Sequence, residues 1–138
     1  MRNILCLLSA LILLSANILA GEVKKVPFAD LDEVVLQSQG LVINNLNLVI
    51  ESALLGGTKA TFQCSCKNKS KTSLNYTIYI AAFDKAGTLL TCFGVEPTLN
   101  MHEAGKVENL ESSGLVDSAT KGKIDHVLLK VIVQKESE

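Results

Sequence analysis

The cysteines are the residues of this chain most able to do chemistry. Cys64 and Cys66 are separated by one serine, and Cys92 lies on a later segment. Thiols form disulfides, bind soft metal ions or act as nucleophiles when they are deprotonated. Redox enzymes usually carry Cys-x-x-Cys at a helix start, where the helix dipole lowers the thiol pKa, and this chain lacks that arrangement. The pattern therefore favours a structural role over redox catalysis.

A disulfide is the first expectation for Cys64, Cys66 and Cys92, because a pair within reach becomes oxidised outside the cytoplasm. Residues two apart on one strand have Cα atoms near the upper distance limit for a disulfide, which disfavours a bond between Cys64 and Cys66. We therefore predict that Cys92 bonds to either Cys64 or Cys66. Cys66 is favoured because it lies nearer the following loop. The remaining thiol is buried or pairs between chains; alternatively, all three cysteines are small buried residues.

A soft-metal site is the alternative use of the same cysteines. Two thiolates on one strand face could hold Cu(I), and the neighbouring Met101 and His102 offer further soft or borderline ligands. The set Cys64, Cys66, Met101 and His102 would make this a thiol- or copper-handling protein of the periplasm. The main interpretation includes no metal and no cofactor.

The two histidines, His102 and His126, show no catalytic arrangement. No nucleophile-elbow sequence surrounds a serine. His126 follows Asp125 in a predicted strand, so strand alternation predicts that their side chains point to opposite faces. The remaining acids are scattered and are expected on a solvated face: Glu108, Glu111 and Asp117. We therefore predict that the protein is not an enzyme.

The stretch 74–93 is the clearest structural element. Apolar and polar residues alternate up to Phe83, which predicts a strand, and residues 84–87 (DKAG) predict a type I turn with a glycine bulge. If Asp84 faces Thr88, the register pairs Ile80 with Cys92 and Tyr79 with Phe93. Cys92 then lies on the core face. The opposite, half-apolar face is the candidate interaction surface: Tyr79, Phe83 and Phe93.

Further strands are expected over residues 41–51, 58–67, 106–113 and 124–134, each bounded by turn residues. Residues 21–40 are expected as an N-terminal lead-in containing a short helix or strand. We predict an all-β protein, an antiparallel β-sandwich of six to seven strands over residues 41–138.

Several motifs resemble the FxLYD-type immunoglobulin-like domains of exported bacterial proteins. They are CSCKNKS, YTIYIAAFDKAGTLL, LNMHEAGKVENLESS and IDHVLLKV, which together span about residues 58–134. The matching positions are Lys67-Asn68, Phe83-Asp84, Gly87, Gly105 and 127–133. The turn after Leu99 lacks the proline that often precedes the glycine in that family. The resemblance implies an immunoglobulin-like sandwich outside the cytoplasm, without catalysis, and it carries over no functional residues.

Residues 1–20 have the layout of a secretory signal peptide. Arg2 gives a positive start, residues 4–14 form an apolar run, and Ala20 is a suitable last residue before cleavage. The run is shorter than the about 20 residues that span a membrane, and Cys6 leaves with the signal. No later stretch predicts a membrane span, and no basic run suggests nucleic acid. We expect a periplasmic or secreted binding or structural module with a protein partner in the cell envelope.

Overall fold

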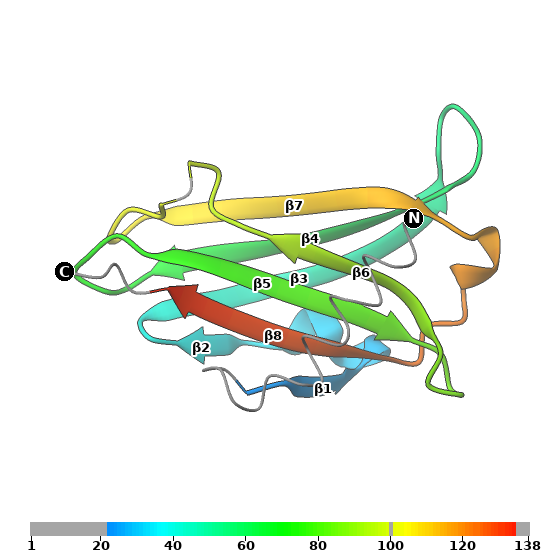
Figure 1. Cartoon of the computed structure of the whole chain (residues 1–138), viewed down its shortest axis with the longest axis horizontal. Coiled ribbons are helices and arrows are strands. Elements are labelled where there is room, and N and C mark those ends of the chain that lie inside the picture. Colours follow the sequence, from blue (N-terminus) through cyan, green and yellow to red (C-terminus); the bar gives the residue numbers. More distant parts are fainter. Residues whose placement is uncertain (1–21, 100, 135–138) are drawn as a thin grey trace.

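The computed structural model describes residues 22–99 and 101–134, which form eight strands in two antiparallel sheets of four (Figure 1). One sheet has the order β1-β8-β5-β6 and the other the order β2-β3-β4-β7. The strand bounds are β1 Lys24–Pro27, β2 Leu36–Ser38, β3 Leu41–Ser52, β4 Thr58–Asn68, β5 Asn75–Phe83, β6 Leu89–Val95, β7 Val107–Val116 and β8 His126–Gln134. Two 3-10 helices complete the elements, η2 Phe28–Glu33 and η3 Ser118–Thr120. The predicted all-β sandwich is confirmed; the predicted signal peptide lies outside the described residues.

The N-terminal segment is part of the sandwich. β1 pairs with β8 at the edge of one sheet, and β2 pairs with β3 at the edge of the other. The helix η2 joins these two edges and buries Leu31. These two short strands raise the count from the predicted six or seven to eight. Within the described residues, no helix is long and apolar enough to cross a membrane.

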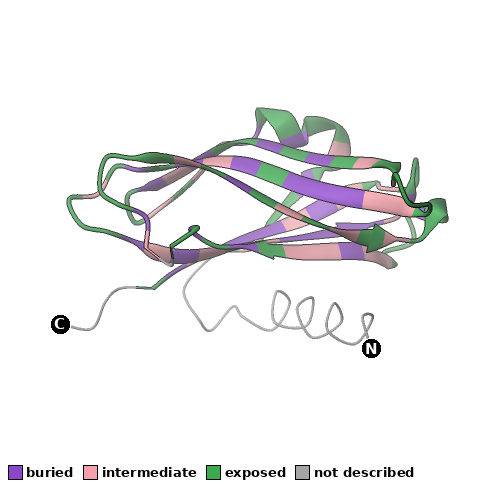
Figure 2. Cartoon of the chain, turned by 90° about the horizontal axis from the view of Figure 1, so that it is seen from above, coloured by how far each residue is buried: buried purple, intermediate pink, exposed green. Residues whose placement is uncertain are grey.

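The core lies between the sheets and follows the alternation of the sequence. The inward positions of β4 are buried at Ala60, Phe62, Cys64 and Cys66, and those of β8 at Val127, Leu129, Val131 and Val133. Figure 2 shows this as alternating buried and exposed bands along the strands. In β3, Asn45 has a φ of +51° at a bulge, which moves the inward positions from Leu41 and Ile43 to Leu46 and Leu48. The bulge lets one strand keep its apolar side chains inside along its whole length.

The predicted register of β5 and β6 is wrong beyond the first pair. Phe83 does face Leu89, but Ala82 faces Thr91, so Leu90 is an extra residue in β6. A one-residue shift moves every later side chain to the other face. Ile80 consequently faces Phe93, which packs against the core, and Ala81 faces Cys92, which lies on the outer face of the sheet.

Candidate functional site

Two thiols lie side by side in the core. Cys64 and Cys66 occupy consecutive inward positions of β4, and their Sγ atoms are 3.8 Å apart, a hydrogen-bond contact. Both are buried, whereas Cys92 lies on the outer face of the other sheet. None of the three is disulfide-bonded, so the predicted bond from Cys92 to Cys66 or Cys64 is wrong. The physical reason is the extra residue in β6, which turns Cys92 away from β4.

A buried Tyr–His pair continues the polar cluster. The Tyr76 hydroxyl oxygen is 2.7 Å from His102 Nδ1, and His102 Nε2 is 2.8 Å from the Lys106 carbonyl oxygen. His102 sits just before β7, where its backbone forms an isolated bridge with Leu74. Both ring nitrogens are therefore engaged. A buried polar network of this kind is stable because its groups satisfy one another.

The expectation that Glu108 lies on a solvated face is wrong, because its side chain is half-buried and its carboxylate faces the interior. Glu108 stands directly opposite Cys66 in the β4–β7 ladder, two residues from the inward Leu110. Its Oε2 atom is buried and has no hydrogen-bond partner. Glu108 lies two residues before the apolar Leu110, and residues i and i+2 of a strand share a face, so the sequence contained the information for this orientation. A carboxylate thus lies beside the thiol pair.

The surroundings shift the acidity of these groups in opposite directions. The hydrogen bond between the thiols, together with burial, raises the pKa of Cys64. The same bond, aided by the Tyr76 hydroxyl, lowers the pKa of Cys66, although burial and the Glu108 charge oppose it. Burial raises the pKa of Tyr76. Of the two thiols, Cys66 is therefore the one whose anion is stabilised.

The four-residue metal set that the sequence offered as an alternative is not assembled. Both ring nitrogens of His102 are hydrogen-bonded, one to the Tyr76 hydroxyl and one to the Lys106 carbonyl oxygen. Met101, the next residue in the chain, is half-buried. Among residues 22–99 and 101–134, no group of three or more His, Cys, Asp or Glu side chains could hold a metal ion. Within that set, the structure brings the side chains of Cys64 and Cys66 together.

The outer face of the β1-β8-β5-β6 sheet carries a second apolar cluster. Ala81 and Phe83 are its buried members, and half-buried side chains pack against them: Tyr79, Leu89, Cys92 and Leu128. Tyr79 and Phe83 thus lie on the face predicted for them, but Phe93 lies on the core side. Contact within the cluster is intramolecular, which makes this face a small second core.

His126 closes one end of this outer cluster. Its ring stacks on Phe83 with the centroids 5.4 Å apart, and its Nδ1 atom is 2.9 Å from Asp125 Oδ2. The expectation that Asp125 and His126 point apart is therefore wrong. Asp125 precedes the first residue of β8, so strand alternation does not apply to it. The pair braces the start of β8.

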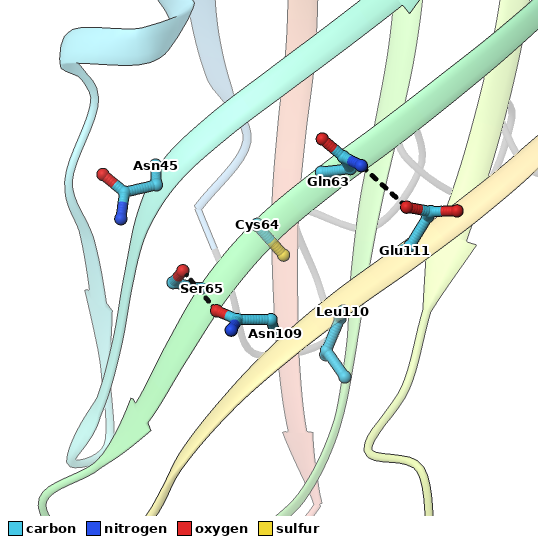
Figure 3. A pocket seen from close by; sticks show the side chains of 7 residues that line it. All are labelled: Asn45, Gln63, Cys64, Ser65, Asn109, Leu110 and Glu111. Atoms are coloured by element: carbon cyan, nitrogen blue, oxygen red, sulfur yellow. Dashed lines mark hydrogen bonds between the residues drawn. The ribbon is translucent and has the colours of Figure 1, made fainter.

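A groove lies on the other sheet between β3, β4 and β7, lined by Cys64 and Leu110 as well as by polar side chains (Figure 3). Its side chains form two cross-strand hydrogen bonds between β4 and β7. Gln63 Nε2 donates to Glu111 Oε2 at 2.7 Å, and Ser65 Oγ donates to Asn109 Oδ1 at 2.7 Å. Asn45 lines the same groove from the bulge of β3. These polar groups satisfy one another, as expected for the solvated face of an antiparallel sheet.

An apolar loop tip stands out from the rest of the surface. Leu54 and Leu55, between β3 and β4, are 105% and 102% exposed relative to a reference residue. Two backbone hydrogen bonds close the loop: Gly56 N donates to Ala53 O, and Ala53 N donates to Gly57 O, both at 3.0 Å. In Figure 1 this loop projects beyond the sheets. We call Leu54 and Leu55 the apolar tip; the Leu-Leu-Gly-Gly sequence could have signalled it.

Comparison with known proteins provides no relative for this chain. No family model matches it, and neither a curated protein nor a solved structure does so. The thiol pair and the apolar tip are therefore interpreted from their own geometry.

Proposed function

We propose that this chain is an exported, non-catalytic binding module that holds a protein partner through the apolar tip. The observation that carries the proposal is the full exposure of two adjacent leucines on a loop fixed by two backbone hydrogen bonds. Export is supported by the signal-like residues 1–20. The non-catalytic part is supported by the lack of any catalytic motif in the sequence.

Folding does not require leucines at this position. The turn depends on Gly56 and Gly57, which have φ angles of +92° and +89°, a region that favours glycine. Leu54 and Leu55 bury nothing against their own chain. Exposed apolar groups of this kind commonly mark interaction sites. The two side chains are therefore best explained by a contact outside the chain.

The energetics suit a specific but modest contact. Fully burying one leucine side chain contributes about 1.5–3 kcal/mol, so the pair could supply about 3–6 kcal/mol. For comparison, a dissociation constant of about 1 mM corresponds to about 4 kcal/mol. The closed turn holds the tip in one conformation, which reduces the entropy lost on binding. Residues behind the tip would add contact area, since Leu115 is 52% and Val49 36% exposed.

The flanking charges favour a protein partner over an anionic membrane. Lys59 stands opposite Glu51 in the β3–β4 ladder, so the base of the hairpin carries balanced charge. Attraction to anionic lipids depends on an excess of basic residues near the surface. A balanced base with an apolar tip matches a partner that offers an uncharged, apolar pocket.

The proposal can be tested by photo-cross-linking in the native host. A photoreactive amino acid replaces Leu55 in the full chain, and the same residue replaces Leu99, which is 83% exposed, in the control. We expect one discrete protein adduct from position 55 and not from position 99. Excess purified wild-type protein should compete the adduct away, whereas the Leu54→Lys/Leu55→Ala double variant should not.

Three outcomes would contradict the proposal. The first is an identical adduct pattern from both positions, and the second is an adduct that the double variant competes as well as wild type. The third is a lipid adduct in place of a protein, which would assign the tip to a membrane surface. The double variant should unfold at the same temperature as wild type, because exposed substitutions usually change stability by less than about 0.5 kcal/mol.

A further inference from the structure

The thiol pair has a geometry that suits a bound ion better than a covalent bond. Its Sγ atoms are 3.8 Å apart, so the sulfurs already converge, yet Cys64 and Cys66 are not disulfide-bonded. They occupy alternate positions of a regular strand, where Cα atoms are about 6.6 Å apart, near the upper limit for a disulfide. Two metal–sulfur bonds of about 2.3 Å could bridge 3.8 Å in a bent arrangement, or in a straight one after a movement below about 1 Å.

We propose that Cys64 and Cys66 together bind one soft monovalent cation of the Cu(I) or Ag(I) class. Soft thiolate ligands suit Cu(I), zinc and iron–sulfur clusters. Zinc in proteins almost always has at least three protein ligands, and no third His, Cys, Asp or Glu joins the pair among the described residues. A two-thiolate site therefore favours an ion that is satisfied by two ligands. This site is independent of the apolar tip.

Binding requires no oxidant. Each thiol loses its proton to solvent, two metal–sulfur bonds form, and the oxidation state of the cation does not change. The resulting bis-thiolate complex carries one negative charge. Tyr76 donates its hydroxyl hydrogen to His102 Nδ1, because His102 Nε2–H donates to the Lys106 carbonyl oxygen. Turning that hydrogen to the nearby Cys66 sulfur would stabilise the charge only at the cost of the bond to His102.

Glu108 has the opposite effect and offers an internal check. Its carboxylate stands opposite Cys66, and its buried Oε2 atom has no hydrogen-bond partner. A second negative charge beside a bis-thiolate weakens it by like-charge repulsion. Replacing Glu108 by glutamine keeps the shape and removes the charge. Cys64 lines the groove between β4 and the edge strand β7, and this groove offers the ion a route from solvent.

The experiment is an anaerobic titration of the reduced, full-length protein with Cu(I) held by a coloured chelator. We expect one Cu(I) per chain in wild type and in the Cys92→Ser control, which removes a thiol on the outer face. Cys64→Ser and Cys66→Ser should each fail to remove Cu(I) from the chelator. Glu108→Gln should bind about tenfold more tightly, which corresponds to about 1.4 kcal/mol.

A second measurement, of the unfolding temperature, distinguishes loss of copper binding from loss of folding. Cu(I) should raise the unfolding temperature of wild type and Cys92→Ser, because a ligand that binds only the native state stabilises it. Cys64→Ala and Cys66→Ala, which place a small apolar residue in the core, should fold and show no such rise. Stoichiometric copper in either single variant of the pair, equal loss in Cys92→Ser, or no copper in folded wild type would overturn the proposal.

Discussion

The turns of the hairpins β3–β4 and β5–β6 share a hydrogen-bond pattern but display residues of opposite polarity. Gly56 N donates to Ala53 O in one, and Gly87 N donates to Asp84 O in the other, at 3.0 and 3.1 Å. A second bond closes each loop, from Ala53 N to Gly57 O and from Asp84 N to Thr88 O. The first turn displays Leu54 and Leu55, whereas the second displays Lys85 and Ala86. Since one hydrogen-bond pattern accommodates both pairs of displayed residues, the leucines are not a requirement of that pattern.

The same two hairpins differ in how their strands continue from the turn. β3 and β4 pair without interruption from Ser52–Thr58 to Asn47–Gln63, and their bulge lies deeper in the sheet. In β6 the extra residue Leu90 follows directly after the first pair. A bulge close to the turn reverses the faces of almost the whole strand, whereas a distant one reverses only its far part.

The largest effect should come from the glycines that both turns share. Gly56 and Gly87 have φ angles of +92° and +80°, and an added Cβ at either would meet nothing within 4 Å. Gly56→Val and Gly87→Val should each lower the free energy of unfolding by about 1–2 kcal/mol through backbone strain alone. Urea denaturation of each variant and of wild type measures this difference in the free energy of unfolding.

The matched control is Gly114→Ala. Gly114 does not have a positive φ, and an added Cβ would lie 3.6 Å from the Phe93 ring, an ordinary contact. Alanine there should be neutral or slightly stabilising. If valine were tolerated at one turn and not at the other, the two turns would not be equivalent in solution.

The parts of the fold that the sequence predicted are those set by period-two alternation. The inward residues of β4 and β8 were identified correctly. No bulge interrupts the pairing of β4 with β7 or of β8 with β5, so the alternation of the sequence continues along both strands. The bulge at Leu90 could not be predicted, because both registers place apolar residues inside: Leu90 and Cys92 in one, and Phe93, beside the polar Thr91, in the other. The choice depends on tertiary packing, in which the large Phe93 side chain gains more from burial.

A smaller effect should follow from the capping carboxylate of the second turn. Asp84 Oδ1 accepts a hydrogen bond from Thr88 N at 2.8 Å, and Ala53 occupies the equivalent position in the first turn. Asp84→Ala should lower the free energy of unfolding by about 0.5–1.5 kcal/mol. Ala53→Asp should raise it by up to a similar amount, since Gly57 N can then be capped. Equal and opposite shifts in the urea midpoint would confirm the equivalence; destabilisation by both changes would contradict it.

The candidate sites were only partly predictable for related reasons. Cys64 and Cys66 were placed correctly on one inward face, because both lie on an uninterrupted stretch of β4. The disulfide from Cys92 and the outward position of Phe93 were wrong, because both followed from a hairpin register that the extra residue Leu90 shifts. Tyr76 and His102 meet across a bridge between two loop-end residues, which no local pattern indicates.

The smallest effect on stability should come from exchanging the displayed residues. Leu54→Lys/Leu55→Ala combined with Lys85→Leu/Ala86→Leu moves the apolar pair from one turn to the other, and all four positions are exposed. The free energy of unfolding should change by less than about 0.5 kcal/mol.

The exchange should nevertheless abolish the cross-link expected at the first tip without creating one at the second. Only the first hairpin has exposed apolar residues behind it, Leu115 and Val49, that extend the contact area. A photoreactive residue at position 86 of the exchanged protein tests this directly. If the same adduct appeared there, two exposed leucines on any closed turn would suffice, and the position of the tip on the sandwich would contribute nothing to recognition.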